Sequence, residues 1–278
     1  SCNPCSRIYQ RVITISNNEN EADFSSISDA IYQCFGTKEG NYKNGIFTDN
    51  QQTNNKFRGF LSEENIYVIQ VSPGIYKEII HLPNYVHLIG TDTISSTIIS
   101  FPDNINNQFN QNNEDNQNEP INLITLENNT LLKNISIDSS INIENKYKKI
   151  NSISVINKNN IVLDNIRFFD KYSNYNINYG MYIYGGYNIQ LNNLYIEFNT
   201  GYNKNYGIYC HYTDINILNT TIKINCLSKY NYGIFIDKMK NINLSHSFIE
   251  LKDGENNICL YHQNTSSKIG FCQLSINT

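Results

Sequence analysis

The chain has 278 residues, of which 17% are charged, and its formal net charge at pH 7 is −4. Nucleic-acid binding relies on clustered Lys and Arg that neutralise phosphates, and the sequence contains no basic stripe, so we predict no nucleic-acid partner. No apolar run approaches the roughly 20 residues that a membrane-spanning helix needs, so we predict no membrane partner. The length is large for one ordinary domain, but a solenoid of stacked repeats grows along its axis as a single body.

The first predicted element is a helix near residues 24–35. Its apolar residues recur at the spacing of one helix face, and serines precede them as capping residues. These apolar residues are Ile27, Ala30, Ile31 and Cys34. We expect residues 1–65 to form an N-terminal tether and cap, with an insertion at 36–64.

Residues 66–100 contain strand-like segments around a Pro-Gly turn. Here the pattern V-x-P-G-x-Y-x-E, followed by L-I-G, resembles the entry segment of the pectin lyase-like superfamily, particularly its pectinesterase-like branch. The resemblance is carried by Val71, Pro73, Gly74, Tyr76, Glu78, Leu88, Ile89 and Gly90. It implies a right-handed parallel β-helix that begins in this segment and whose end is closed by a capping helix.

The next segment, residues 101–121, is rich in Asn and Gln and poor in apolar residues. Such a composition cannot bury enough surface to pack. We therefore expect a protruding loop between two coils of a β-helix that spans residues 66–278.

From about residue 122 onward one pattern recurs: apolar, any, apolar, any, Asn, apolar or small, any, apolar. Its copies are NTLLKNISI, NIVLDNIRF, NIQLNNLYI, DINILNTTI, NINLSHSFI and KIGFCQLSI. They lie about 26 to 31 residues apart, a period typical of solenoids. Each period holds about three segments of alternating apolar residues and no helical periodicity. The predicted fold class is therefore all-β, a right-handed single-stranded parallel β-helix with an N-terminal capping α-helix.

The Asn of this pattern predicts a corner of the coil. A sharp turn between two strands needs one residue at positive φ, and Asn tolerates that conformation best among the non-glycine residues. Stacked side-chain amides would then hydrogen-bond from coil to coil in a ladder. The predicted ladder is Asn134, Asn165, Asn193 and Asn219, ended by His246 and Gln273. The alternative interpretation of the row is a ligand site.

A strand entered by Gly180, Gly207 or Gly233 occurs in three successive repeats. Aligning these strands places Tyr184, His211 and Asp237 in one outward row, with neighbours about 4.8 Å apart. We therefore predict His211 and Asp237 as a catalytic acid/base pair in which the carboxylate orients the imidazole. The alternative is a ladder of polar side chains on the surface.

Tyrosines crowd the same predicted face. A ring that carries a hydroxyl suits both sugar stacking and protein interfaces. The predicted ligand-binding residues are Tyr182, Tyr184, Tyr209 and Tyr212, with Phe235 continuing the row of Tyr182 and Tyr209. The alternative is a genomic bias, because the abundance of Asn, Ile, Tyr and Lys and the absence of Trp resemble proteins of AT-rich genomes, including those of large DNA viruses of amoebae.

Seven cysteines are present. Cys2 and Cys5 predict a local or intermolecular disulfide near the tether, since no thioredoxin-like unit accompanies them. Cys210 stands where neighbouring repeats have the inward Ile183 and Ile236, so we expect it to act as a small core residue. Acidic residues are scattered over the coils and assemble no calcium cage, so we predict no metal and no cofactor.

The motifs that identify pectinesterase-like, polygalacturonase-like and pectate lyase-like enzymes are not found in the sequence. We therefore predict a non-catalytic module, extracellular or on a virion surface, that displays a binding face to a glycan or to a capsid or fibre protein, with a homotrimer as its expected assembly. One alternative is a carbohydrate-active enzyme, a hydrolase, lyase or esterase, that uses His211 and Asp237. Another is an architectural spacer or fibre cap.

Overall fold

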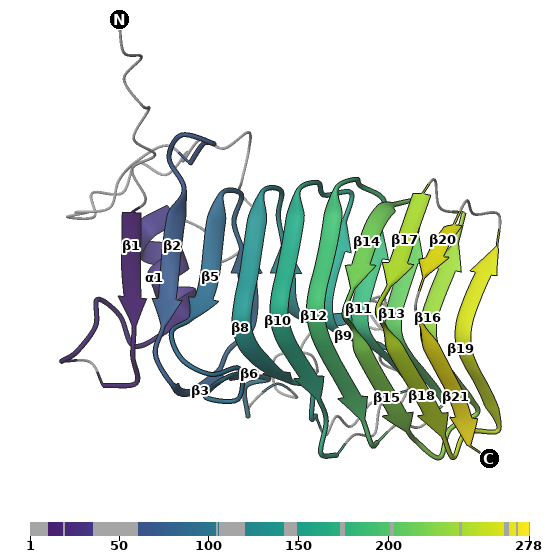
Figure 1. The fold of residues 1–278 in the computed structure, drawn as a ribbon. Helices are drawn as coiled ribbons and strands as arrows, with labels where there is room; N and C mark the ends of the chain where they lie inside the picture. Colours follow the sequence, from purple (N-terminus) through teal and green to yellow (C-terminus); the bar gives the residue numbers. More distant parts are fainter. Residues whose placement is uncertain are drawn as a thin grey trace, which may run out of the picture.

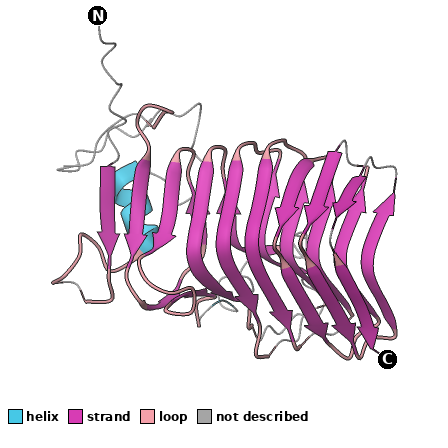
Figure 2. Ribbon diagram, in the orientation of Figure 1, coloured by secondary structure: helices cyan, strands magenta, loops and turns pink. Residues whose placement is uncertain are grey.

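The structure is a computed structural model that describes residues 11–18, 20–35, 61–103, 105, 120–141, 149–172, 176–200, 203–238, 241–263, 267–270 and 272–277. The chain winds into a right-handed parallel β-helix, with α1 (Ile27–Phe35) as the helix of the described residues (Figures 1 and 2). The predicted fold class is confirmed. Most of the insertion predicted at 36–64, most of the loop predicted at 101–121, and Cys2 and Cys5 lie outside the described residues.

Two parallel sheets form the walls of the β-helix. The main path of the 14-stranded sheet is β1 (Arg11–Ile15), β2 (Tyr67–Val71), β5 (Val86–Gly90), β8 (Thr130–Asp138), β10 (Ile161–Phe169), β12 (Ile189–Phe198), β14 (Asp214–Leu218), β17 (Asn241–Ser245) and β20 (Ser267–Gly270). Its remaining strands are β3 (Gly74–Lys77), β6 (Thr97–Ser100), β15 (Thr221–Asn225), β18 (Phe248–Lys252) and β21 (Gln273–Asn277). The seven-stranded sheet contains β4 (Ile80–Leu82), β7 (Ile121–Leu126), β9 (Lys149–Ile156), β11 (Ile177–Tyr184), β13 (Lys204–His211), β16 (Tyr230–Asp237) and β19 (Asn256–Gln263).

The core follows from the alternation of each strand. Leu163, Leu191 and Ile217 pair in register on successive coils and are no more than 1% exposed. Their side chains stack along the axis, so every coil covers the apolar residues of the next. Cys210 is fully buried in the same interior, as its alignment with Ile183 and Ile236 predicted.

The corner predicted from the repeated Asn is present. The backbone is left-handed at four Asn residues and at His246, with φ between 50° and 57°. The four residues are Asn134, Asn165, Asn193 and Asn219. Gln273 was wrongly aligned, because it begins β21 and pairs with Phe248, two residues beyond His246. A shift of the alignment by two residues keeps every side chain on the same face of the strand. The alternation of apolar and polar residues therefore cannot distinguish the correct alignment from the shifted one.

The last residue of the entry motif caps the N-terminus of the capping helix α1. Glu78, its last residue, accepts hydrogen bonds from the backbone N–H groups of Ile27 (3.0 Å) and Ser28 (2.7 Å) at the start of α1. Ser26 caps the same turn by accepting from the N–H of Asp29 at 3.1 Å. A carboxylate here satisfies first-turn N–H groups and opposes the positive end of the helix dipole. The helix thereby packs at the N-terminal end of the solenoid, near β1 and β4 (Figure 1).

Candidate functional site

The outer face of the seven-stranded sheet carries a row of stacked aromatic rings. Strand register aligns Tyr182, Tyr209, Phe235 and Tyr261 on β11, β13, β16 and β19. Successive ring centroids are 5.2, 5.1 and 4.5 Å apart, with planes within 9° of parallel. Because neighbouring rings cover one another's faces, Tyr182 and Tyr209 offer a ligand mainly their edges and hydroxyl groups.

A second aromatic stack lies beside the first and was missed in the sequence. Tyr179, Tyr206 and Tyr232 stack with centroids 4.8 Å apart. Tyr206 meets the first stack edge to face, 5.6 Å from Tyr209. Burial raises the pKa of Tyr209 to about 12 and that of Tyr179 and Tyr206 further, so these hydroxyl groups remain hydrogen-bond donors at neutral pH. In the sequence this stack is marked by the tripeptide Asn-Tyr-Gly, whose Gly enters each of the three predicted strands.

The Asn of the same tripeptide forms a ladder inside the coil. Asn205 donates to Asn231 and Asn231 donates to Asn257, each at 3.0 Å. Asn178 begins this row, fully buried, and neither its Oδ1 nor its Nδ2 has a hydrogen-bond partner. The ladder from Asn205 to Asn257 therefore pairs buried amides that are cut off from water, whereas Asn178 stays outside it.

His211 and Asp237 meet as predicted from the strand alignment. They are paired in register on β13 and β16, and Nδ1 of the imidazole is 3.1 Å from Oδ2 of the carboxylate. Both side chains are largely buried, and neither Nδ1 of His211 nor Oδ1 of Asp237 makes a hydrogen bond, so the two groups meet at ion-pair distance without hydrogen-bond geometry. A hydrogen bond from Nδ1 to this carboxylate would favour the tautomer with its proton there and would leave Nε2 as the basic nitrogen.

Two exposed tyrosines frame this pair. Tyr184 stacks on the imidazole at 5.1 Å between centroids, and Tyr212 meets it edge to face at 4.2 Å. Their side chains are 37% and 47% exposed. The Lys238 ammonium lies 5.6 Å from the Tyr212 ring centroid, within the range of a cation–π contact. The structure therefore gathers Tyr184, His211, Tyr212 and Asp237 into one cluster, which we call the Tyr–His cluster.

The corner ladder lies on a different part of the coil. Asn165 donates to Asn134 at 2.8 Å and Asn219 donates to Asn193 at 2.7 Å. Asn193, however, donates to Asp164 at 2.8 Å rather than to Asn165. A carboxylate is a stronger acceptor than an amide, so the charge-assisted bond replaces one step of the ladder. Asn193 and Asn219 are exposed to solvent. Their hydrogen bonds therefore do not compensate for a loss of contact with water.

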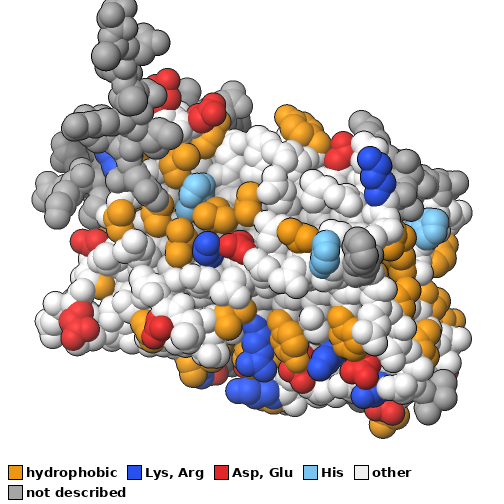
Figure 3. Space-filling view, viewed as in Figure 1, with side chains coloured by type: hydrophobic (Ala, Val, Ile, Leu, Met, Phe, Trp, Pro, Cys, Tyr) orange, Lys and Arg blue, Asp and Glu red, His pale blue; other side chains and the backbone are white. Residues whose placement is uncertain are grey.

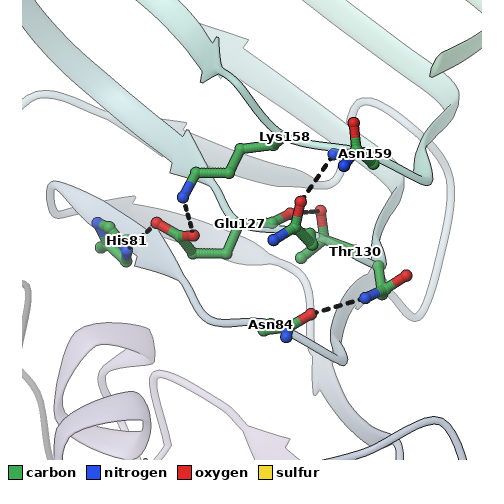
Figure 4. A network of polar contacts seen from close by, with 8 residues as sticks. His81, Asn84, Glu127, Thr130, Lys158 and Asn159 are labelled. Atoms are coloured by element: carbon green, nitrogen blue, oxygen red, sulfur yellow. Dashed lines mark hydrogen bonds and ion pairs between the residues drawn. The ribbon is translucent and has the colours of Figure 1, made fainter. Parts of the chain in front are cut away.

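A second polar cluster joins three coils near the N-terminal end of the seven-stranded sheet (Figure 4). Glu127 pairs with His81, at 3.1 Å from Nε2, and with the Lys158 ammonium. Burial acts to raise the pKa of Glu127, but hydrogen bonds and charges from His81 and Lys158 outweigh it and lower the pKa below its ordinary value. Its partners come from the segments of β4 and β9, which the sequence pattern does not relate.

Among the described residues, no three His, Cys, Asp or Glu side chains could hold a metal, and the described cysteines form no disulfide. No described helix is long and apolar enough to cross a membrane. A shallow pocket of about 300 Å³ opens on the 14-stranded sheet, lined by Asp214, Asn216, Asn243 and Lys268 among others. That pocket contains none of the predicted site residues.

Comparison with solved structures gives matches at low sequence identity, and the three described below have TM-scores under 0.5. No protein-family model and no curated protein matches the chain. A pectin methylesterase from Aspergillus niger is 11% identical, with a TM-score of 0.48 over 99% of this chain and 87% of that one. A carrot pectin methylesterase is 12% identical, with a TM-score of 0.35 over 92% of this chain and 87% of that one.

An alginate lyase of family PL6 is 8% identical, with a TM-score of 0.39 over 95% of this chain. This chain covers 39% of that enzyme's length. At these identities the activities of the three enzymes do not transfer to this chain.

Proposed function

We propose that the Tyr–His cluster binds a carbohydrate. The observation that carries the proposal is the position of two exposed tyrosine rings, Tyr184 and Tyr212, beside the paired His211 and Asp237. A sugar presents an apolar C–H face and a rim of hydroxyl groups. Aromatic rings suit the first, and imidazole, carboxylate and phenol groups donate to or accept from the second.

The scaffold suits the display of such a surface. The cluster lies at the ends of β11, β13 and β16, each held by parallel pairing on both sides and by the stacked tyrosines. Side chains on paired strands keep their spacing better than side chains on loops, which lowers the entropy lost on binding. The setting that we propose is a rigid extracellular module, on a fibre or a virion surface.

The test is retention on a panel of immobilised neutral and acidic polysaccharides. Tyr212 has φ of 52°, so Tyr212→Asn removes the ring while Asn tolerates the backbone conformation. We expect this variant and Tyr184→Ala to lose at least about tenfold in affinity, the equivalent of roughly 1.4 kcal/mol. The matched control is Leu227→Asn, which removes an exposed side chain just before the opposite end of β16. Failure of the wild-type protein to bind any glycan would overturn the proposal and favour an architectural spacer.

A second candidate function is hydrolysis, elimination or de-esterification of a polysaccharide. The specific observation that favours it is the 3.1 Å approach of the Asp237 carboxylate to Nδ1 of His211 in a largely buried pair. In this reaction Nε2 of His211 would take a proton from water or substrate, while Asp237 stabilises the imidazolium.

Asp237→Asn separates the two functions because it preserves the shape of the side chain and removes its charge. For an enzyme, we expect wild-type protein to release oligosaccharides, methanol or acetate, detected by mass, and Asp237→Asn to release at least about 100-fold less. Glycan retention should fall far less than product release in the same variant, because the Asn amide can still hydrogen-bond to sugar hydroxyl groups. Retention without products from wild-type protein would reject the catalytic candidate and leave the binding function.

A further inference from the structure

A polar pocket lies on the outer face of the 14-stranded sheet. Its volume is about 300 Å³, at the lower end of the range for small-molecule sites. Figure 3 looks onto this face, where hydrophobic side chains gather over the N-terminal strands and mostly uncharged polar groups cover β14 and β17. We call the site the amide pocket, and its polar side chains are Asn188, Asp214, Asn216, Asn241, Asn243 and Lys268.

The amide pocket begins where a ladder of side-chain amides ends. Each rung donates from Nδ2 to Oδ1 of the previous coil, from Asn129 to Asn84 at 2.9 Å, from Asn160 to Asn129 at 2.7 Å and from Asn188 to Asn160 at 2.9 Å. The same position on the next coil is Asp214, which begins β14 as Asn188 directly precedes β12. A carboxylate has no proton to donate, so the ladder stops. Among the described residues, Oδ1 of Asn188 then accepts one long bond, 3.4 Å from Nε2 of Gln190.

Other polar groups of the pocket also lack partners. Oδ1 of Asp214 accepts the backbone N–H of Asn241 at 3.0 Å, but Oδ2 makes no hydrogen bond or ion pair with the described residues. Asn216 and Asn243 pair in register on β14 and β17, strands that are themselves paired on both sides. Their side chains form no hydrogen bond with each other or with another described residue. These groups are therefore free to bind a ligand.

Lys268 adds hydrogen-bond donors to the pocket. It pairs in register with Asn243, and its ammonium makes no ion pair with the described residues. A pocket that contains both an unpaired carboxylate and an unpaired ammonium group disfavours a ligand with a net charge of either sign. Four of the six polar side chains are carboxamides, which both donate and accept, so the pocket matches a neutral ligand whose groups do the same.

We propose that the amide pocket binds one neutral sugar unit by its hydroxyl edge. Two vicinal hydroxyl groups donate to Oδ2 of Asp214 and Oδ1 of Asn188, the acceptors that the ladder leaves open, and further sugar oxygens accept from Lys268. None of the described residues that line the pocket is aromatic, so this site does not stack on the face of a sugar as the Tyr–His cluster would. It is a second site, and it does not depend on the function proposed for that cluster.

The test is saturation-transfer NMR of the purified protein with the methyl α-glycosides of glucose, galactose and mannose, and with glycine as a zwitterionic probe. We expect at least one of the sugars to bind with a dissociation constant on the order of 1 mM, because the pocket holds one small ligand. The 3-deoxy analogue of that sugar has no vicinal pair of ring hydroxyl groups, and we expect it to bind at least about tenfold more weakly.

Asp214→Asn separates binding from folding. The new Asn keeps an Oδ1 for the N–H of Asn241 and gains an Nδ2 that can donate to Asn188, which continues the ladder. We therefore expect stability in urea no lower than that of wild type and sugar binding at least about tenfold weaker. The matched control is Asp92→Asn, since Asp92 is exposed, its Oδ1 also accepts a backbone N–H, and it does not line the pocket. Lys268→Met, which removes the donors at an exposed position, replaces Asp214→Asn if the latter fails to fold and should weaken binding likewise.

Absence of saturation transfer to all three sugars, binding of glycine alone, equal binding of the 3-deoxy analogue, or unchanged binding by Asp214→Asn would overturn the proposal. Binding that is lost in Tyr184→Ala and kept in Asp214→Asn would assign the sugar to the Tyr–His cluster and would also overturn it. Binding that requires Asp214 in a protein that retains no polysaccharide would support the amide pocket and reject the function of the Tyr–His cluster, so the two proposals fail separately.

Discussion

Replacement of Asn219 tests the physical reason for the repeated Asn. Asn219 has φ of 51° and donates a 2.7 Å hydrogen bond to Oδ1 of Asn193. The left-handed backbone costs an ordinary residue about 1–2 kcal/mol, and Gly pays none of this. The hydrogen bond is exposed, so its net contribution is near the low end of the usual range, about 0.5 kcal/mol.

The backbone cost and the hydrogen bond together predict that the Gly variant is more stable than the Ala variant. Asn219→Ala loses the hydrogen bond and places Ala in the left-handed region, for a loss of about 1.5–2.5 kcal/mol. Asn219→Gly loses the same hydrogen bond but relieves the backbone, and after the entropy cost of Gly the loss is about 0.5–1 kcal/mol. In a regular strand Gly is the worse residue, so an advantage of Gly over Ala by about 1 kcal/mol identifies the backbone as the cause.

The assay is urea unfolding monitored by circular dichroism. The free energies of unfolding are compared between variants whose unfolding free energy depends on urea concentration with the same slope. Asn216→Ala is the matched control, because Asn216 is an exposed residue of the neighbouring β14 and is not among the residues at positive φ. It should change stability by less than about 0.5 kcal/mol. A Gly variant as unstable as the Ala variant, or more so, would refute the reasoning and assign the role of Asn219 to its side-chain hydrogen bond.

Two further perturbations probe the coil contacts. Gly207→Ala should unfold at a markedly lower temperature than wild type, because the added Cβ would lie 2.6 Å from the Gly233 carbonyl oxygen. Gly270→Ala is the control and should melt like wild type, because its added Cβ meets nothing within 4 Å. Equal melting temperatures of the two variants would contradict the tight packing at Gly207. The lowered pKa of Glu127 means that its ion pair with Lys158 stabilises the fold fully above about pH 4.5, and that this stability is lost as the pH falls through the folded-state pKa. Glu127→Gln should therefore be less stable near neutral pH and should lose less stability on acidification, measured by urea unfolding at several pH values; an identical pH profile would show that Glu127 does not contribute.

Much of the site was accessible from the sequence because strand pairing in a solenoid is regular. Once Gly180, Gly207 and Gly233 were aligned, register placed His211 beside Asp237 without knowledge of any loop. The same alignment contained the Asn-Tyr-Gly tripeptide, but the inward and outward directions of its Asn and Tyr were not apparent from alternation, because pairing skips the glycine. The buried Asn ladder and the second tyrosine stack were missed for that reason.

Other features depended on contacts between segments whose patterns are unrelated. Asn193 pairs with Asp164 because a charged acceptor on the previous coil competes with the amide of Asn165, which no repeat pattern encodes. Glu127 meets His81 and Lys158 only because β4, β7 and β9 stack in that order. The exposure of Tyr184 and Tyr212, compared with the mutual coverage of Tyr182 and Tyr209, likewise follows from stacking between coils.

The sequence by itself determined the all-β solenoid, its capping helix and the corner at each repeated Asn, because alternation, helical spacing and positive φ are local properties of a chain. The tertiary structure decided which polar groups became partners and which tyrosine rings stayed accessible. Those outcomes depend on distances between coils and on competition among neighbours, and a one-dimensional pattern contains neither.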